Sequence, residues 1–289
     1  MISRPLIIVA TVAAALGLMA SWHVGSLWMT GQHSAVAPAK YPARDLRLRT
    51  ADGLAIAASF RPGLHDRAPA ILLLHPAHGS RASTADTAAW LSRLGYATLA
   101  IDFRGHGESD QANRTFGVRE ALDARAAFDW LKRHQHGAPV AVIGISLGGA
   151  ASLIGDAGPL PADAMILQAV YPDIRQAVRN RIAQRLSAAP AYLLEPLLSL
   201  QLPLRYGLWP SRFSPREALG RYPGPVLVIG GLQDSASTPA DSRALAAAAA
   251  GPHSLWLVPV GDHAEMVSLN SPAYRHRIRT FLEKTMPRP

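Results

Sequence analysis

An apolar run that leads directly into a Gly-x-Ser-x-Gly motif is the feature that most constrains this chain. Residues 139–145 are suited to a buried strand, and Gly144-Ile145-Ser146-Leu147-Gly148 follows without a break. A small-residue segment with helical potential, 147–154, comes next. A serine on so sharp a strand-to-helix turn is held clear of the backbone, and the glycines leave room for the turn. The motif is short, so its meaning depends on its surroundings.

Strand and helix patterns alternate along the chain from about residue 45. An antiparallel hairpin is predicted first, around the favoured turn dipeptide Asp52-Gly53. Its strands and the six that follow are expected at 45–50, 54–60, 70–75, 96–102, 139–145, 163–170, 225–230 and 253–260. Helical patterns separate most of these strands. The sequence therefore predicts an α/β fold with a doubly wound, mostly parallel eight-stranded sheet.

One insertion, residues 172–222, interrupts the alternation. Apolar residues recur there every four positions with arginines beside them, which is the pattern of an amphipathic basic helix. They are Ile174, Val178, Ile182 and Leu186, with Arg175, Arg179, Arg181 and Arg185. The arginines either form a solvated helix face or bind an anionic lipid or substrate. We expect the insertion to form a helical cap over the carboxyl edge of the sheet.

The first thirty residues are expected to form a separate hydrophobic helix. Residues 5–39 contain no Asp, Glu, Lys or Arg, and 6–28 are long enough to cross a bilayer. A signal-cleavage pattern at Ala35-Val36-Ala37 lies well beyond the apolar core, so a retained anchor is favoured over a cleaved signal peptide. Arg4 precedes the span, which predicts a cytoplasmic N-terminus and an extracytoplasmic main domain. Cleavage would instead give a secreted or periplasmic protein.

The predicted organisation is therefore a membrane anchor or signal segment over 1–30, a linker over 31–43 and one large domain over 44–289. The net charge is +9, but the arginines are scattered and no nucleic-acid-binding motif is present. We expect no nucleic-acid partner, and an attraction to anionic membrane surfaces explains the charge more simply. The absence of cysteine excludes disulfides, cysteine-based zinc sites and a cysteine nucleophile. The pair His134 and His136 lacks an acidic partner nearby, so no metal site is predicted.

The chain resembles the α/β-hydrolase family over about residues 45–286. The resemblance is carried by a strand ending in His75, the loop 102–109, the motif 144–148, Asp234 in Gly-Leu-Gln-Asp, and His263 in Gly-Asp-His. The chain order of serine, acid and histidine is the order that this fold uses. The resemblance implies a serine hydrolase that acts on a small-molecule ester or acyl substrate and needs no cofactor.

Ser146 is the candidate nucleophile, His263 the base that takes its proton, and Asp234 the acid that orients the base. Asp262 is next to His263 but badly placed to orient it, and His253 opens a strand rather than following one.

The candidate oxyanion hole consists of the Leu147 and Ala77 backbone N–H groups, with His78 as the alternative to Ala77. Pro76 stands where the family commonly has glycine and has no N–H to donate. His75 and His106 are expected to brace loops rather than transfer protons.

These observations favour a membrane-anchored or exported serine hydrolase, carboxylesterase- or lipase-like, that works through an acyl-enzyme. A serine aminopeptidase or a thioesterase would use the same residues. A non-catalytic membrane-surface binding protein on the same fold is the alternative from another class. The leucine-rich cap favours an apolar acyl group.

Overall fold

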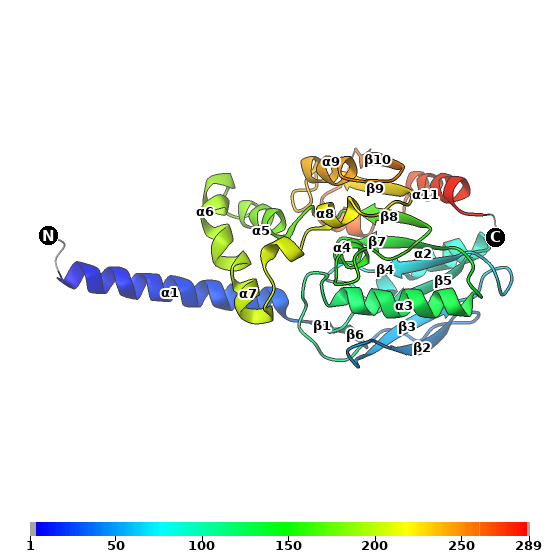
Figure 1. The fold of residues 1–289 in the computed structure, drawn as a ribbon, viewed down its shortest axis with the longest axis horizontal. Coiled ribbons are helices and arrows are strands. Elements are labelled where there is room, and N and C mark those ends of the chain that lie inside the picture. Colours follow the sequence, from blue (N-terminus) through cyan, green and yellow to red (C-terminus); the bar gives the residue numbers. More distant parts are fainter. Residues whose placement is uncertain (1–3, 260, 288–289) are drawn as a thin grey trace.

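The computed structural model describes residues 4–259 and 261–287, and its centre is an eight-stranded sheet (Figure 1). The strand order is β10-β9-β8-β7-β4-β5-β3-β2; β3 is antiparallel to both of its neighbours, β5 and β2, and the other neighbouring pairs are parallel. The strands are β2 (Arg44–Arg49), β3 (Ala55–Arg61), β4 (Ala70–Leu74), β5 (Ala97–Ile101), β7 (Val140–Ile145), β8 (Ala164–Gln168), β9 (Val226–Gly231) and β10 (His253–Val258). The predicted α/β class and mostly parallel eight-stranded sheet are confirmed.

Helices cover both faces of this sheet, which explains why its central strands are apolar without alternation. In β4, Leu72 and Leu74 enter one core and Ile71 and Leu73 the other. The first core is closed by α3 (Glu120–His134), α4 (Leu147–Leu153), α8 (Pro215–Leu219) and α9 (Pro239–Ala247). The second is closed by α2 (Ala85–Arg93), which follows the 3₁₀ turn η1 (Arg81–Thr84), and by α10 (His263–Val267) and α11 (Pro272–Thr285).

The predicted cap is a group of helices between the sheet and the N-terminal helix. It contains α5 (Ile174–Ala183), α6 (Ala188–Ser199), α7 (Gln201–Tyr206), the short turn η2 (Pro210–Arg212) and α8. The apolar stripe of α5 is buried in a third core with Leu202 and Phe213. Arg175 and Arg179 of α5 lie 3.1 Å and 3.5 Å from carboxylate oxygens of the buried Glu195 of α6. These two arginines therefore hold cap helices together rather than forming a purely solvated face.

The N-terminal helix α1 (Arg4–Met29) projects away from the domain, and only its C-terminal end packs against the cap (Figure 1). Of the helices in the described ranges, it is the one long and apolar enough to cross a membrane. Met29 is buried in the third core with Ile174 and Leu202. Directly after α1, β1 (Gln32–His33) pairs in parallel with β6 (His106–Gly107). Part of the predicted linker is thus hydrogen-bonded to the main domain.

Candidate active site

The candidate nucleophile Ser146 occupies the sharp turn between β7 and α4. Its φ of 49° and ψ of −109° lie outside the regions that side-chain-bearing residues favour, and its N–H donates to the Gln168 carbonyl at 2.8 Å. A Cβ at Gly148 would come within 2.3 Å of the Leu74 carbonyl oxygen. Glycine at that position therefore lets α4 pass close to β4, which the motif predicts.

The structure brings Asp234 and His263 together from two loops. Asp234 follows β9, His263 begins α10 just after β10, and Nδ1 of the imidazole lies 2.8 Å from Oδ2 of the carboxylate. The other oxygen, Oδ1, accepts the N–H groups of Ala236 and Ser237, each at 2.8 Å. The Asp234 side chain is fully buried. This arrangement favours the tautomer with hydrogen on Nδ1, which leaves Nε2 of His263 able to accept a proton.

Ser146 lies at the same edge of the sheet, since β7, β9 and β10 are parallel and all three residues follow carboxyl ends. Ser146 and His263 are both half-buried. Within residues 4–259 and 261–287, no hydrogen bond joins the Ser146 hydroxyl to the His263 imidazole. Such contacts are often long in unliganded enzymes and shorten when substrate is bound.

Gln168, at the end of β8, connects the two sides of the site and was not identified from the sequence. Its carbonyl accepts the Ser146 N–H, and its side-chain amide donates to the Met266 carbonyl in α10. Its amide oxygen accepts the hydroxyl of the buried Tyr274 at 2.7 Å. Gln168 thus positions the helix that carries His263 relative to the serine turn. The sequence signal that could have identified Gln168 is that it is the one polar residue at the end of an apolar strand.

The candidate oxyanion donors lie on the serine turn and on the loop after β4. Leu147 is the first residue of α4, where a helix leaves its N–H groups without internal partners. His75 donates from Nδ1 to the Pro76 carbonyl at 2.7 Å and accepts the Phe103 N–H at Nε2. The Ala77 N–H belongs to the same peptide unit as the Pro76 carbonyl and points the opposite way. The hydrogen bond from His75 therefore fixes the direction of the Ala77 N–H.

The next peptide of the loop after β4, which carries the Ala77 carbonyl, is held by two other side chains. The Ala77 carbonyl lies 2.8 Å from Nε2 of His106 and accepts from Arg114 Nη1 at 2.7 Å. The same guanidinium donates twice to the Trp28 carbonyl, at 3.0 Å and 2.6 Å, at the end of α1. The predicted bracing roles of His75 and His106 are confirmed. Arg114, which the sequence did not single out, joins the loop after β4 to the N-terminal helix.

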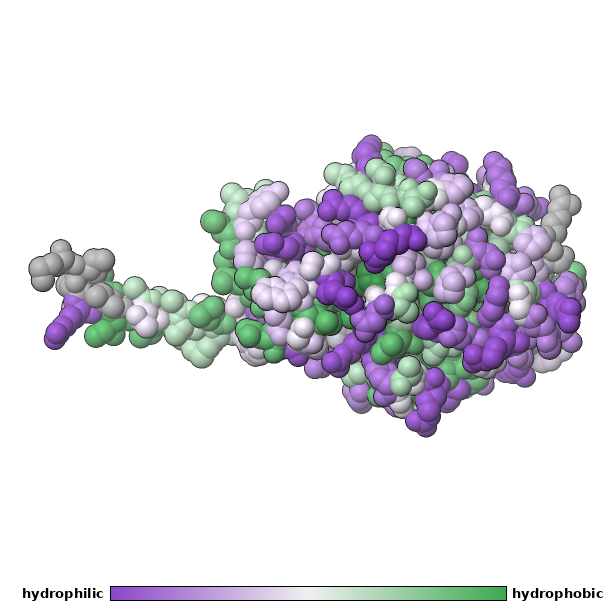
Figure 2. Space-filling model, in the orientation of Figure 1, coloured by the Kyte–Doolittle hydropathy of each residue, from purple (hydrophilic) through white to green (hydrophobic). Residues whose placement is uncertain are grey.

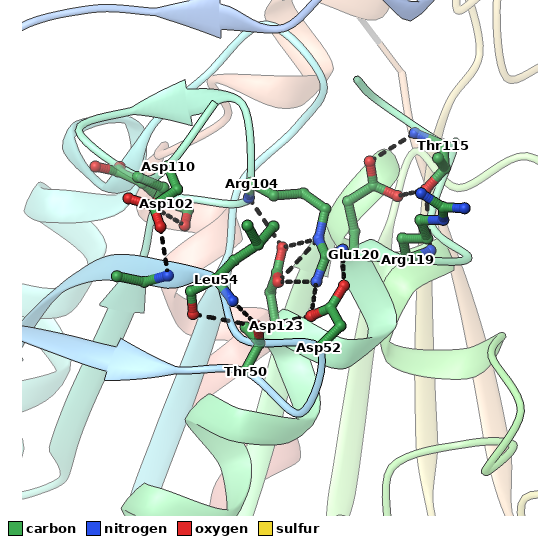
Figure 3. Close-up of polar contacts among 12 residues, drawn as sticks. Thr50, Asp52, Leu54, Asp102, Arg104, Asp110, Thr115, Arg119, Glu120 and Asp123 are labelled. Carbon is green, nitrogen blue, oxygen red and sulfur yellow. Dashed lines mark hydrogen bonds and ion pairs between the residues drawn. The ribbon is translucent and has the colours of Figure 1, made fainter. Parts of the chain in front are cut away.

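A second buried arginine organises the loop that carries His106 (Figure 3). Arg104 pairs with Asp123 of α3 at 2.7 Å and with Asp52 of the β2–β3 turn at 2.6 Å. The hydrogen bonds from Arg104 lower the pKa of Asp52 to about 2, against the opposing effect of its partial burial. Removing one partner of such a buried pair costs about 3–5 kcal/mol, so this network stabilises the loop.

Positive groups gather beside the candidate base. Burial lowers the pKa of His78, and the charges of Arg114 and Arg181 lower it further, with smaller effects from His106 and His263. Arg181 is exposed on α5 and acts electrostatically on Asp234. It forms no ion pair with the part of the chain that the structure describes. The surroundings of the site are therefore cationic.

The alternatives weighed from the sequence lie elsewhere. Asp262 is exposed, and its side chain caps α10 by accepting the Glu265 N–H at 3.0 Å. His253 is exposed at the start of β10 and contacts the Gly251 carbonyl. No group of three or more metal-ligating side chains occurs among the residues described.

A family model described as serine aminopeptidase, S33, matches residues 65–206. That range contains Ala77, Ser146 and much of the cap, and it ends before Asp234 and His263. Among solved structures, the esterase Pf2001 of Pyrococcus furiosus has a TM-score of 0.69 at 19% identity, over 90% of this chain and 99% of its own. The chain therefore has the α/β-hydrolase fold.

The chain is also similar to an acetyl xylan esterase of Paenibacillus sp. R4, with a TM-score of 0.63 and 18% identity over 94% of each chain. It is 28% identical to the uncharacterized protein YqkD of Bacillus subtilis, over 66% of this chain and 63% of the relative. It is 32% identical to the lysophosphatidylserine lipase ABHD12 of Gallus gallus, over 42% of this chain and 33% of the relative. The matches thus span less than two thirds of both curated relatives.

Proposed function

We propose that this α/β-hydrolase cleaves carboxylic esters through an acyl-enzyme formed on Ser146, as a carboxylesterase or lipase does. The observation that carries the proposal is the buried Asp234 carboxylate bonded to Nδ1 of His263, at the sheet edge where Ser146 occupies a strained turn. A serine hydroxyl is a weak nucleophile, and an oriented imidazole is the group that activates it.

In the proposed first step, Ser146 Oγ attacks the acyl carbon while Nε2 of His263 takes the hydroxyl proton. The Leu147 and Ala77 N–H groups bind the oxyanion that forms. The intermediate then collapses, and the leaving alcohol takes the proton from His263. A water molecule attacks the acyl-enzyme, gives its proton to His263, and the acid departs as the proton returns to Ser146.

The cationic surroundings support an ester with an acidic or neutral leaving group. An aminopeptidase must bind the ammonium group of a peptide, and the charges of Arg114 and Arg181 would repel it. The name of the chicken relative, a lysophosphatidylserine lipase, supports a lipid ester with an acidic head group. We therefore rank a lipid ester above a peptide amide.

We further propose that α1 is retained as a membrane anchor, with the N-terminus in the cytoplasm and the catalytic domain on the extracytoplasmic side. The length and apolar composition of α1 support this, as does the burial of Met29 in the cap. The partners of the protein are then the bilayer and a small ester or acyl substrate, and nucleic acid is not among them.

The proposal is tested with a fluorophosphonate probe, which reacts covalently with activated serines. The full-length protein should be labelled, and the Ser146→Ala variant should not, whereas Ser268→Ala, which removes an exposed serine, should label normally. Equal labelling of wild type and Ser146→Ala would overturn the assignment. No labelling of the folded wild type would favour the non-catalytic membrane-surface protein instead.

The substrate class is tested with esters of increasing acyl length, matched thioesters, and peptide amides. We expect Arg181→Gln to raise KM for esters with an acidic head group and to leave KM for neutral esters unchanged. Arg185→Gln, a charge loss on an exposed side chain just beyond α5, is the matched control. Faster turnover of peptide amides than of esters would favour the aminopeptidase.

A further inference from the structure

The outer surface of the cap is apolar where it adjoins α1. The large apolar side chains exposed there are Leu186, Tyr192, Leu193, Leu194, Leu197, Leu200, Leu204 and Trp209. We call this set the cap leucine face. Leu193 and Leu204 are 79% and 78% exposed. Figure 2 shows apolar side chains along α1 and on the part of the cap next to it, whereas much of the catalytic domain in view is hydrophilic.

No charge interrupts the cap leucine face between residues 186 and 204. Glu195 is the one charged residue in that stretch, and it is buried against Arg175 and Arg179 on the inner side of α6. Soluble proteins rarely expose a contiguous apolar patch of this kind, and a charge-free one marks an interaction site. Exposed apolar residues elsewhere, such as Leu64 and Leu232, are isolated.

The contacts between the cap and α1 fix the level of this face along the helix. The Gln201 amide donates to the Ser21 carbonyl at 3.0 Å, and the Arg205 guanidinium donates to the Trp22 carbonyl at 2.7 Å. The same guanidinium lies 3.7 Å from the centre of the Trp22 ring. A Cβ at Gly25 would meet the Gln201 amide oxygen at 2.2 Å, so the helix and the cap are in close contact.

The length of α1 then places the cap at the membrane. Residues 5–20, which precede the first cap contact, extend about 24 Å at 1.5 Å per residue. A bilayer core is about 30 Å thick, so a spanning α1 needs roughly one more turn inside the hydrocarbon. That turn begins at Ser21 and Trp22, the residues bonded to Gln201 and Arg205. The cap, which contacts α1 through Gln201 and Arg205, therefore lies at the depth where the hydrocarbon core ends.

We propose that the cap leucine face inserts into the outer part of the leaflet from which α1 emerges, so that the cap is embedded in lipid. The occupant of the face is the bilayer, because the face is continuous with the apolar surface of α1. Arg205 stacks on Trp22 at this level, as interfacial cations and aromatic rings do. The inference rests on the proposed anchoring of α1 and not on the catalytic chemistry.

The test uses single-cysteine variants of the full-length protein, which has no native cysteine. Leu193→Cys and Leu204→Cys report on the cap, Leu16→Cys on α1, and Leu64→Cys and Leu232→Cys serve as exposed controls away from the face. Each is labelled with an environment-sensitive fluorophore in vesicles of phosphatidylcholine with a minority of phosphatidylglycerol. Quenching by spin-labelled lipid is compared with quenching by aqueous iodide.

We expect blue-shifted emission and dominant lipid quenching at Leu193→Cys and Leu204→Cys, with dominant iodide quenching at both controls. Iodide quenching at the cap sites with lipid quenching at Leu16→Cys would overturn the insertion and leave the anchor intact. Loss of lipid quenching at Leu16→Cys would overturn the anchor itself. Blue-shifted emission without lipid quenching at the cap sites would mean that protein, such as a second copy, covers the face.

Discussion

Replacement of Asp234 by asparagine tests the proposed catalytic triad most directly, because the structure determines how the new amide must lie. Oδ1 of Asp234 accepts two backbone N–H groups and Oδ2 faces Nδ1 of His263. In the Asp234→Asn variant, the amide oxygen keeps the two N–H donors, and the amide NH₂ faces His263. Nδ1 must then accept a hydrogen bond, which moves the imidazole proton to Nε2 and prevents it from accepting the Ser146 proton.

The size of the loss follows from the cost of turning that amide around. The productive tautomer would require the amide NH₂ to face the Ala236 and Ser237 N–H groups, leaving two buried donors unpaired. Each unpaired donor costs about 1–3 kcal/mol, so the turned amide lies about 2–6 kcal/mol higher. At 1.4 kcal/mol per factor of ten, kcat/KM should fall roughly 30- to 20,000-fold.

The assay is ester hydrolysis, with the rate of fluorophosphonate labelling as an independent measure and thermal unfolding as the check on folding. Asp262→Asn is the matched control, because it makes the same chemical change one residue from the base at an exposed helix cap. We expect it to retain activity within a factor of about three, as surface substitutions usually do. Full activity in Asp234→Asn, or an equal loss in Asp262→Asn, would refute the assignment of the acid.

Three further outcomes are expected. Burial, and secondarily His106, lowers the pKa of His75 to about 3, so His75 stabilises the fold fully above pH 6.5 and less as the pH falls toward 3. The free energy of unfolding should therefore fall by about 2 kcal/mol from pH 8 to pH 5 because of this group. Thermal melts should show that His75→Gln loses this pH dependence, whereas the control His276→Gln, at an exposed histidine, keeps it. Arg114→Gln should lower stability by about 3 kcal/mol by removing charged hydrogen bonds to two carbonyls, and it should also slow acylation, measured by stopped-flow ester hydrolysis. Gly148→Ala should cost about 1–3 kcal/mol and reduce fluorophosphonate labelling, because its Cβ would meet a backbone carbonyl; normal labelling would contradict the account of the turn.

The fold and the local form of the serine turn could be predicted from the sequence because both depend on short-range constraints. A continuous apolar strand requires helices on both sides, and the steric needs of the turn select glycine at position 148. Asp234 and His263 were also predicted, since each follows a strand whose end lies at the same sheet edge. The direct bond between them is a feature of the structure, and their catalytic roles stay predictions.

The supports around the site were not predictable in the same way. Arg114 bonds to a carbonyl 86 positions earlier, and Gln168 bonds to one 98 positions later. Contacts between a side chain and a distant backbone carbonyl leave no periodic pattern in the sequence. Glu195 did leave a signal, since it is a lone acid in an apolar stretch that follows an arginine-rich helix.

The pairing of β1 with β6 has a consequence for how the enzyme would meet its substrates. Because the strand that follows α1 is part of the hydrogen-bonded structure, the proposed anchoring of α1 in a bilayer would leave no flexible linker between the membrane and the main domain. Ser146 would then be held at a fixed distance from the lipid surface and in a fixed orientation to it. The enzyme would then select substrates by depth in the membrane. It would favour esters whose scissile bond lies level with Ser146 over esters buried deeper in the bilayer or dissolved in water.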